Sequence, residues 1–136
     1  MGLLDGVFGG AGTDDEPDKY AIIMNAGPED FAAAGNGFNY AVELDDGGYK
    51  VDLFLDGKAS KWPAEFAEDP DRPFNHQWRI LRSRDIVAGA CGYCANAFDA
   101  TEAYHESDME LLSDANSHAP SVAELADDGY EIMTIG

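Results

Sequence analysis

The chain has 136 residues, and its 27 acidic residues outnumber the 8 basic residues to give a formal net charge of −19. The length and the apolar fraction of 45% suit one globular domain with its own core, and they exclude wholesale disorder. The charge excludes nucleic acid as a partner, because phosphate binding needs a basic surface. Since the acids are scattered along the chain and salt screens their repulsion, we interpret them as a halophilic type of surface.

Residues 1–18 differ in composition from the rest of the chain. An apolar tip at 1–8 precedes a segment rich in glycine and acids at 9–18, which shows no apolar period. We expect a flexible lead-in here, followed by a folded domain at 19–136. No stretch approaches the ~20 apolar residues that a membrane helix needs, so we expect no membrane association and a cytoplasmic protein.

From residue 19 onward, strand patterns and helix patterns alternate. Short apolar runs such as 20–24 are typical of strands buried on both faces, and apolar residues at helical spacing follow them. This alternation predicts an α/β fold in three layers, α/β/α, with a mainly parallel sheet of about five strands. The predicted elements are, in chain order, strand 20–24, helix 31–46, strand 49–55, a long loop 58–71, a helix from Pro73, strand 85–90, helix 92–103, strand 109–112, a helix from Pro120 and strand 130–135.

The sequence predicts how two groups of apolar residues are packed. Trp62 and Phe66 fall in the predicted polar loop, where an exposed apolar cluster commonly marks an interface between protein chains. In the helix that begins at Pro120, we expect Val122, Leu125 and Ala126 to face the core.

Cys91 and Cys94 are the only cysteines of the chain, and they lie where the predicted strand 85–90 meets the next helix. Ligands gather at the carboxyl ends of parallel strands. The free N–H groups and the dipole at a helix start favour the thiolate form of Cys91, and Cys94 lies one turn along, within reach of it. Two buried and inert cysteines are the plainer alternative, which the C-x-x-C spacing at this junction disfavours.

Two familiar uses of a cysteine pair fit this chain poorly. A structural zinc site usually takes four ligands, and His76, His105 and His118 show no ligand spacing to the pair, so we expect no metal and no cofactor. The sequence CGYC looks like a thioredoxin motif, but it comes late in the chain, and Pro120 precedes a helix rather than a hairpin.

The order of motifs resembles the DsrE/DsrF-like family of small sulfur-relay proteins from about residue 19 to residue 135. The segment DIVAGACGYCANAF resembles the strand and turn that present the family's cysteine. AIIMNAGPED looks like the family's first strand and its Gly-Pro loop, GFNYAVELDDGGYKVDLFLDG like its long helix and second strand, and SVAELADDGYEIMTIG like its last helix and strand. The chain is similar to a haloarchaeal type of acidic member.

The resemblance implies roles for both cysteines. In members that carry sulfur, a cysteine at the position of Cys91 takes it as a persulfide and passes it on, and some branches have a second cysteine that matches Cys94. The resemblance implies a sulfurtransferase type of sulfur carrier, with sulfur donor and acceptor proteins as partners. It also implies a homo-oligomer, commonly a trimer or a hexamer.

We interpret Cys91 and Cys94 as the catalytic residues of such a carrier, with Cys94 either resolving the persulfide or tuning Cys91. Asn25, Gly27 and Pro28 are expected to line the pocket beside Cys91, because their turn lies at the same sheet edge. Two alternatives stay open, a non-catalytic oligomeric domain that binds a small molecule or a protein, and a CxxC dithiol redox protein.

Half of the basic residues lie just before the cysteine strand, at Arg72, Arg79, Arg82 and Arg84. They create either a local positive field for a thiolate or ordinary ion pairs on an acidic protein, and we favour the ion pairs.

Overall fold

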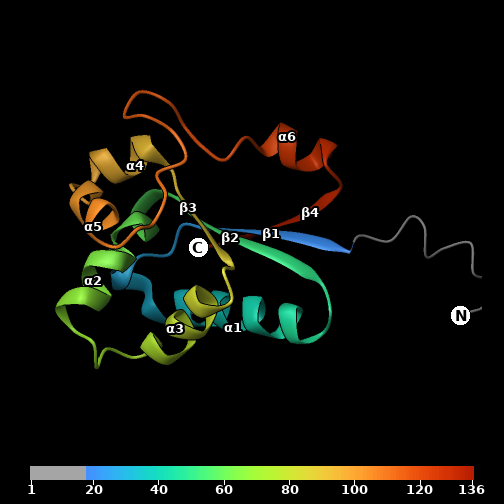
Figure 1. Cartoon of the computed structure of the whole chain (residues 1–136), viewed down its shortest axis with the longest axis horizontal. Coiled ribbons are helices and arrows are strands. Elements are labelled where there is room, and N and C mark those ends of the chain that lie inside the picture. The colour runs from blue at the N-terminus through green and yellow to red at the C-terminus, as the bar shows by residue number, and fades with distance from the viewer. Residues whose placement is uncertain (1–17) are drawn as a thin grey trace, which may run out of the picture.

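Four parallel strands form the centre of the computed structural model, which describes residues 18–136 (Figure 1). The strands lie in the order β3-β2-β1-β4, so the chain folds as the predicted α/β protein. In chain order the elements are β1 (Lys19–Met24), η2 (Pro28–Asp30), α1 (Phe31–Asp46), β2 (Lys50–Leu55), η3 (Gly57–Lys61), α2 (Trp62–Glu68), α3 (Asn75–Ser83), β3 (Val87–Ala90), α4 (Gly92–Ala97), α5 (Thr101–Glu106), α6 (Val122–Asp127) and β4 (Tyr130–Ile135).

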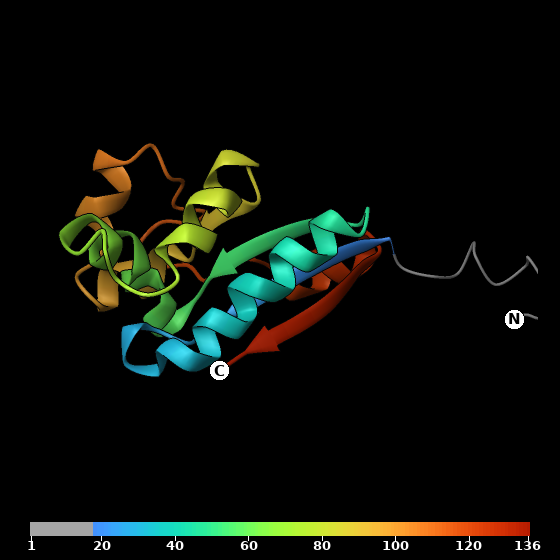
Figure 2. The same cartoon turned by 90° about the horizontal axis from the view of Figure 1, so that it is seen from below.

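The register of the sheet brings the carboxyl ends of all four strands to one edge. Met24 at the end of β1 pairs with Leu55 of β2 and with Ile135 of β4, and Leu55 also pairs with Ala90 of β3. The loops that follow β1, β2 and β3 therefore begin side by side. Helices α2, α4 and α5 gather beyond this edge (Figure 2).

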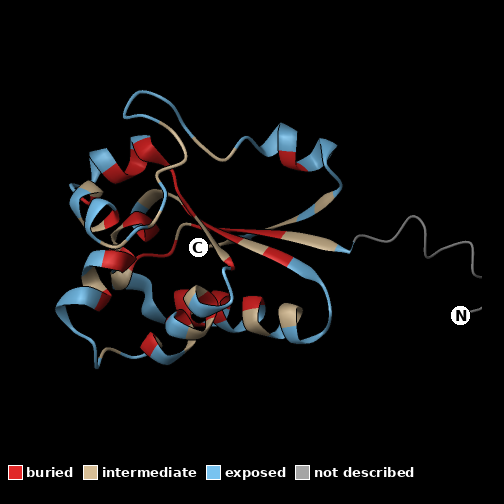
Figure 3. Ribbon diagram, in the orientation of Figure 1, coloured by how far each residue is buried: buried red, intermediate tan, exposed pale blue. Residues whose placement is uncertain are grey.

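The two faces of the sheet are covered unequally. Helix α1 runs along one face (Figure 2) and places Ala34, Phe38 and Ala41, at helical spacing, in the main core. On the other face, α6 contributes only Leu125 to a small cluster with Ile23 and Phe54. The ribbon of α6 is accordingly exposed over most of its length (Figure 3).

Of the three residues of α6 that we expected to face the core, two do not. Leu125 is buried, but Val122 is 53% exposed and Ala126 is also exposed. Because α6 has only six residues, it lays a single side chain on the sheet rather than a full apolar stripe.

The predicted loop 58–71 is wrong, because η3 and α2 occupy most of it. Pro63 lies in the first turn of α2, where a missing N–H costs nothing, so it starts the helix instead of breaking it. Trp62 is fully buried and donates from Nε1 to the Ala26 carbonyl at 2.8 Å, and Phe66 is also buried. Trp62 and Phe66 therefore do not form the exposed cluster that we expected, and they offer no surface for an interface.

Two further differences concern the region around the cysteines. The predicted helix 92–103 divides into α4 and α5, with Asp99 in a left-handed conformation (φ 56°) between them. The predicted strand 109–112 contributes only an isolated bridge between Leu111 and Ala90, so the sheet has four strands rather than about five.

The predicted lead-in 1–18 lies, apart from Asp18, outside the described residues. Across residues 18–136, the helices are all too short or too polar to cross a membrane.

Candidate functional site

The backbone after β3 holds Cys91 at the edge of the sheet. Its N–H donates to the Leu55 carbonyl at 3.0 Å, which continues the pairing with β2 one residue beyond the strand. Helix α4 then begins at Gly92, which packs directly against a neighbouring loop. A Cβ atom on Gly92 would lie 1.8 Å from the carbonyl oxygen of Ser113, so only glycine fits at this turn.

The thiol of Cys91 is fully buried and touches two polar groups. Its Sγ accepts a hydrogen bond from the backbone N–H of Cys94 at 3.4 Å. It also lies 3.7 Å from Nδ1 of His118. An N–H donor and an imidazole are both groups that stabilise a thiolate, so this arrangement suits a nucleophilic sulfur.

The thiol of Cys94 donates a hydrogen bond to Oδ1 of Asp56 at 3.1 Å. Burial and this bond to a carboxylate raise the pKa of Cys94 to about 12. Asp56 is itself held in place, since its Oδ1 accepts the N–H of Gly57 at 2.9 Å and its own N–H donates to the Met24 carbonyl. Cys94 therefore stays protonated at neutral pH.

His118 reaches the thiols from the loop between α5 and α6. Its ring packs on that of Tyr93, with the ring centroids 4.3 Å apart and the planes tilted by 38°. Both side chains are exposed to solvent while Cys91 beneath them is buried. An exposed imidazole thus lies in contact with the buried Cys91 thiol.

The sequence analysis missed His118 and Asp56. No spacing signal indicates His118, because it lies 27 positions from Cys91 in a stretch without periodicity. Asp56 was open to prediction, since it directly follows β2 and so lies at the same edge as Cys91. The histidines show no ligand spacing to the cysteine pair in the sequence, and it is the tertiary structure that brings His118 to Cys91.

The predicted pocket residues lie on the loop after β1. A Cβ atom on Gly57 would lie 2.8 Å from Oδ1 of Asn25, which places the Asn25 side chain beside the residue that follows Asp56. Gly27 packs against Lys58, and the Pro28 carbonyl accepts a hydrogen bond from Arg72 at 2.7 Å. The role of Asn25, Gly27 and Pro28 in lining a pocket stays a prediction.

A hollow of 370 Å³ opens beside His118, between the sheet and α6. Phe54, Leu112 and Leu125 supply apolar side chains to its lining, and Pro120 and Ser121 lie at the start of α6. Because His118 belongs both to this hollow and to the thiol cluster, the two adjoin.

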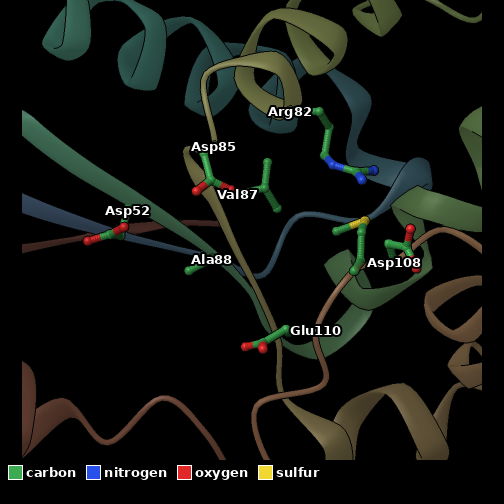
Figure 4. Close-up of a pocket in the computed structure, with 8 residues that line it drawn as sticks. Asp52, Arg82, Asp85, Val87, Ala88, Asp108 and Glu110 are labelled. Carbon is green, nitrogen blue, oxygen red and sulfur yellow. The ribbon is translucent and has the colours of Figure 1, made fainter.

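A second hollow, of 420 Å³, lies along β3 beside Val87 and Ala88, and neither cysteine lines it (Figure 4). Carboxylates dominate its charged lining, as expected for a strongly acidic surface. Its charged residues are Asp52, Arg82, Asp85, Asp108 and Glu110.

Two of the four arginines form ion pairs, which agrees in part with the interpretation that we favoured. Arg72 contacts Glu65 at 2.8 Å, and Arg84 contacts Asp45 and Asp46 at about 3 Å. Arg82 donates to the Ser107 carbonyl at 3.1 Å.

Comparison with known families supplies independent information on this site. The model of the DsrE/DsrF-like family matches residues 18–135, which include the whole sheet, both cysteines, Asp56 and His118. Comparison with curated proteins and with solved structures finds no match. Since the family match covers most of the chain and agrees with its α/β fold, the chain belongs to the DsrE/DsrF-like family.

Proposed function

We propose that the protein is a sulfur carrier in which Cys91 accepts sulfane sulfur as a persulfide and passes it to an acceptor. The observation that carries this proposal is the contact of Cys91 Sγ with His118 Nδ1 at 3.7 Å and with the N–H of Cys94. Membership of a family whose name is tied to sulfur relay supports the same chemistry.

The loading step needs no external oxidant. His118 takes the proton of the Cys91 thiol, and the thiolate attacks the outer sulfur of a donor persulfide. The S–S bond of the donor breaks, its thiol leaves, and that thiol regains the proton from His118. Cys91 then carries the terminal sulfur, which an acceptor nucleophile removes by the same kind of displacement.

Cys94 has a separate role in this scheme. If its sulfur attacked the inner sulfur of the Cys91 persulfide, a disulfide would form and hydrogen sulfide would leave. Burial and the hydrogen bond to Asp56 keep Cys94 in its unreactive thiol form, so this loss of sulfur is slow at neutral pH. Slow loss of sulfur from Cys91 favours the function of a sulfur carrier over that of a dithiol redox protein.

The partners follow from the same proposal. A sulfur donor protein and an acceptor protein would approach over His118 and Tyr93, the exposed cover of Cys91. We also propose a cytoplasmic, halophilic homo-oligomer, a trimer or a hexamer. The thin cover of one sheet face and the 53% exposed Val122 on α6 are the structural support for assembly.

Exposure of the reduced protein to polysulfide, followed by intact-mass spectrometry, tests the carrier. We expect one added sulfur atom on the wild type, none on Cys91→Ser, and on Cys94→Ser an adduct that outlives the wild-type adduct only at high pH, where Cys94 loses its proton. Sulfur that adds only at Cys94, or an unmodified wild type in excess donor, would contradict the proposal.

A further inference from the structure

Three side chains with metal-binding atoms converge at the carboxyl edge of the sheet. Sγ of Cys91, Sγ of Cys94 and Nδ1 of His118 all lie within 4.8 Å of one another. They come from the end of β3, the first turn of α4 and the loop before α6. Both thiols are free.

The spacing suits a single tetrahedral ion. Zinc binds sulfur at about 2.3 Å and nitrogen at about 2.0 Å, so tetrahedral ligand atoms stand roughly 3.5–3.8 Å apart. The distance of 3.7 Å between Cys91 Sγ and His118 Nδ1 already falls in that range. The remaining two pairs of ligand atoms also lie within 4.8 Å of one another.

Asp56 lies next to Cys94 but outside this group of three, whose ligand atoms all lie within 4.8 Å of one another. Its Oδ1 lies 3.1 Å from Cys94 Sγ, and the Gly57 N–H holds it there. A set with two sulfurs and one imidazole suits zinc, whereas it is foreign to magnesium and calcium, which take oxygen ligands. The donor set therefore selects a thiophilic ion.

We propose that Cys91, Cys94 and His118 bind a zinc ion through three protein ligands, with water in the fourth position. Binding releases the two thiol protons to solvent and involves no change of oxidation state. This site does not rest on the sulfur-carrier proposal. The two uses compete for the same atom, because a metal on Cys91 Sγ leaves no free thiolate to take up sulfur.

Titration of the full-length, reduced and chelator-stripped protein with Co²⁺ tests the site, since Co²⁺ reports tetrahedral sulfur coordination by its visible spectrum. Molar KCl and excess Mg²⁺ suppress unspecific binding to the acidic surface. We expect one Co²⁺ per chain with a sulfur-to-cobalt charge-transfer band, and full displacement by Zn²⁺. Cys91→Ser should weaken the band, the double variant Cys91→Ser/Cys94→Ser should abolish it, and His118→Ala should weaken binding by at least about tenfold.

His105→Ala is the matched control, because His105 is an exposed histidine on α5 outside the cluster. It should leave the titration unchanged. A weak octahedral spectrum, or tight binding that survives both His118→Ala and His118→Gln with the fold intact by circular dichroism, overturns the site.

Sulfur loading of the same metal-free preparation, after the reductant is removed, separates the two proposals. A chain that loads sulfur but binds no Co²⁺ overturns the metal site alone. A chain that binds Co²⁺ through sulfur but takes up no sulfane sulfur supports the metal site and overturns the carrier alone.

Discussion

The thiol of Cys94 donates a hydrogen bond to Oδ1 of Asp56 at 3.1 Å. The two residues are 38 positions apart, and their bond joins the first turn of α4 to the end of β2. The same Asp56 oxygen accepts the Gly57 N–H that starts η3. One carboxylate thus shapes the backbone and sets the character of the second thiol.

Asp56→Asn should lower the pKa of Cys94 from about 12 part of the way toward its ordinary value of 9.0. The shift is partial because burial, the larger cause, remains. The amide oxygen still accepts the Gly57 N–H, so the fold is kept. Alkylation of Cys94 by iodoacetamide, followed against pH in a Cys91→Ser background, measures the change. An unaltered pH profile would show that Asp56 has no influence on this thiol.

The stability of the reduced protein should fall between pH 9 and pH 12 in a way that depends on Cys94. Its pKa is raised on folding, so unfolding at these pH values releases a proton that the native state keeps. The stabilisation is complete below pH 9 and is lost as pH rises through the folded pKa. Urea unfolding of wild type and Cys94→Ser isolates the effect, because Tyr104, whose pKa burial also raises, titrates in both. If the free energy of unfolding fell equally with pH in the two proteins, the predicted role of Cys94 would be contradicted.

His118→Ala should slow sulfur loading of Cys91 by about a hundredfold, since a positioned general base contributes roughly 10²–10⁴ to a rate. The contact at 3.7 Å is the basis of this expectation. Rates come from intact-mass time courses at fixed polysulfide concentration. His105→Ala should retain the wild-type rate, and equal rates for all three proteins would remove His118 from the mechanism.

Gly92→Ala should destabilise the protein by about 1–3 kcal/mol, the usual cost of overpacking. Its Cβ would meet the Ser113 carbonyl at 1.8 Å and push away the loop that carries His118. Gly48→Ala is the comparison, because that glycine has open space around it and only an unfavourable φ of +93°. Thermal melts should fall in both variants, whereas iodoacetamide labelling of Cys91 should change only in Gly92→Ala. Unchanged labelling there would mean that the loop does not position His118.

Stability should rise steeply from dilute buffer to molar KCl. The chain carries a formal charge of −19, and salt shortens the range of its self-repulsion to about 3 Å at 1 M. Thermal melts across this range measure the gain. A flat curve would reject the halophilic interpretation of the acids.

Local pattern was sufficient to predict much of the fold. The apolar run after Lys19 and the run from Tyr130 to Ile135 are the strands β1 and β4. The predicted place of Cys91, directly after a strand and before a helix, is confirmed. Periodicity failed at Trp62, because a polar segment with two prolines hides a short helix whose aromatic side chains are buried in the core.

The sequence by itself determined the alternation of strands and helices and the placing of both cysteines at a sheet edge, since both depend on neighbours within a few residues. The tertiary structure alone decided that His118 faces Cys91 and that Asp56 faces Cys94. These contacts span 27 and 38 positions of the sequence. They depend on the order of the strands in the sheet and on the path of the loop that carries His118, in which apolar residues show no regular spacing. The raised pKa of the Cys94 thiol is therefore a property of the folded chain.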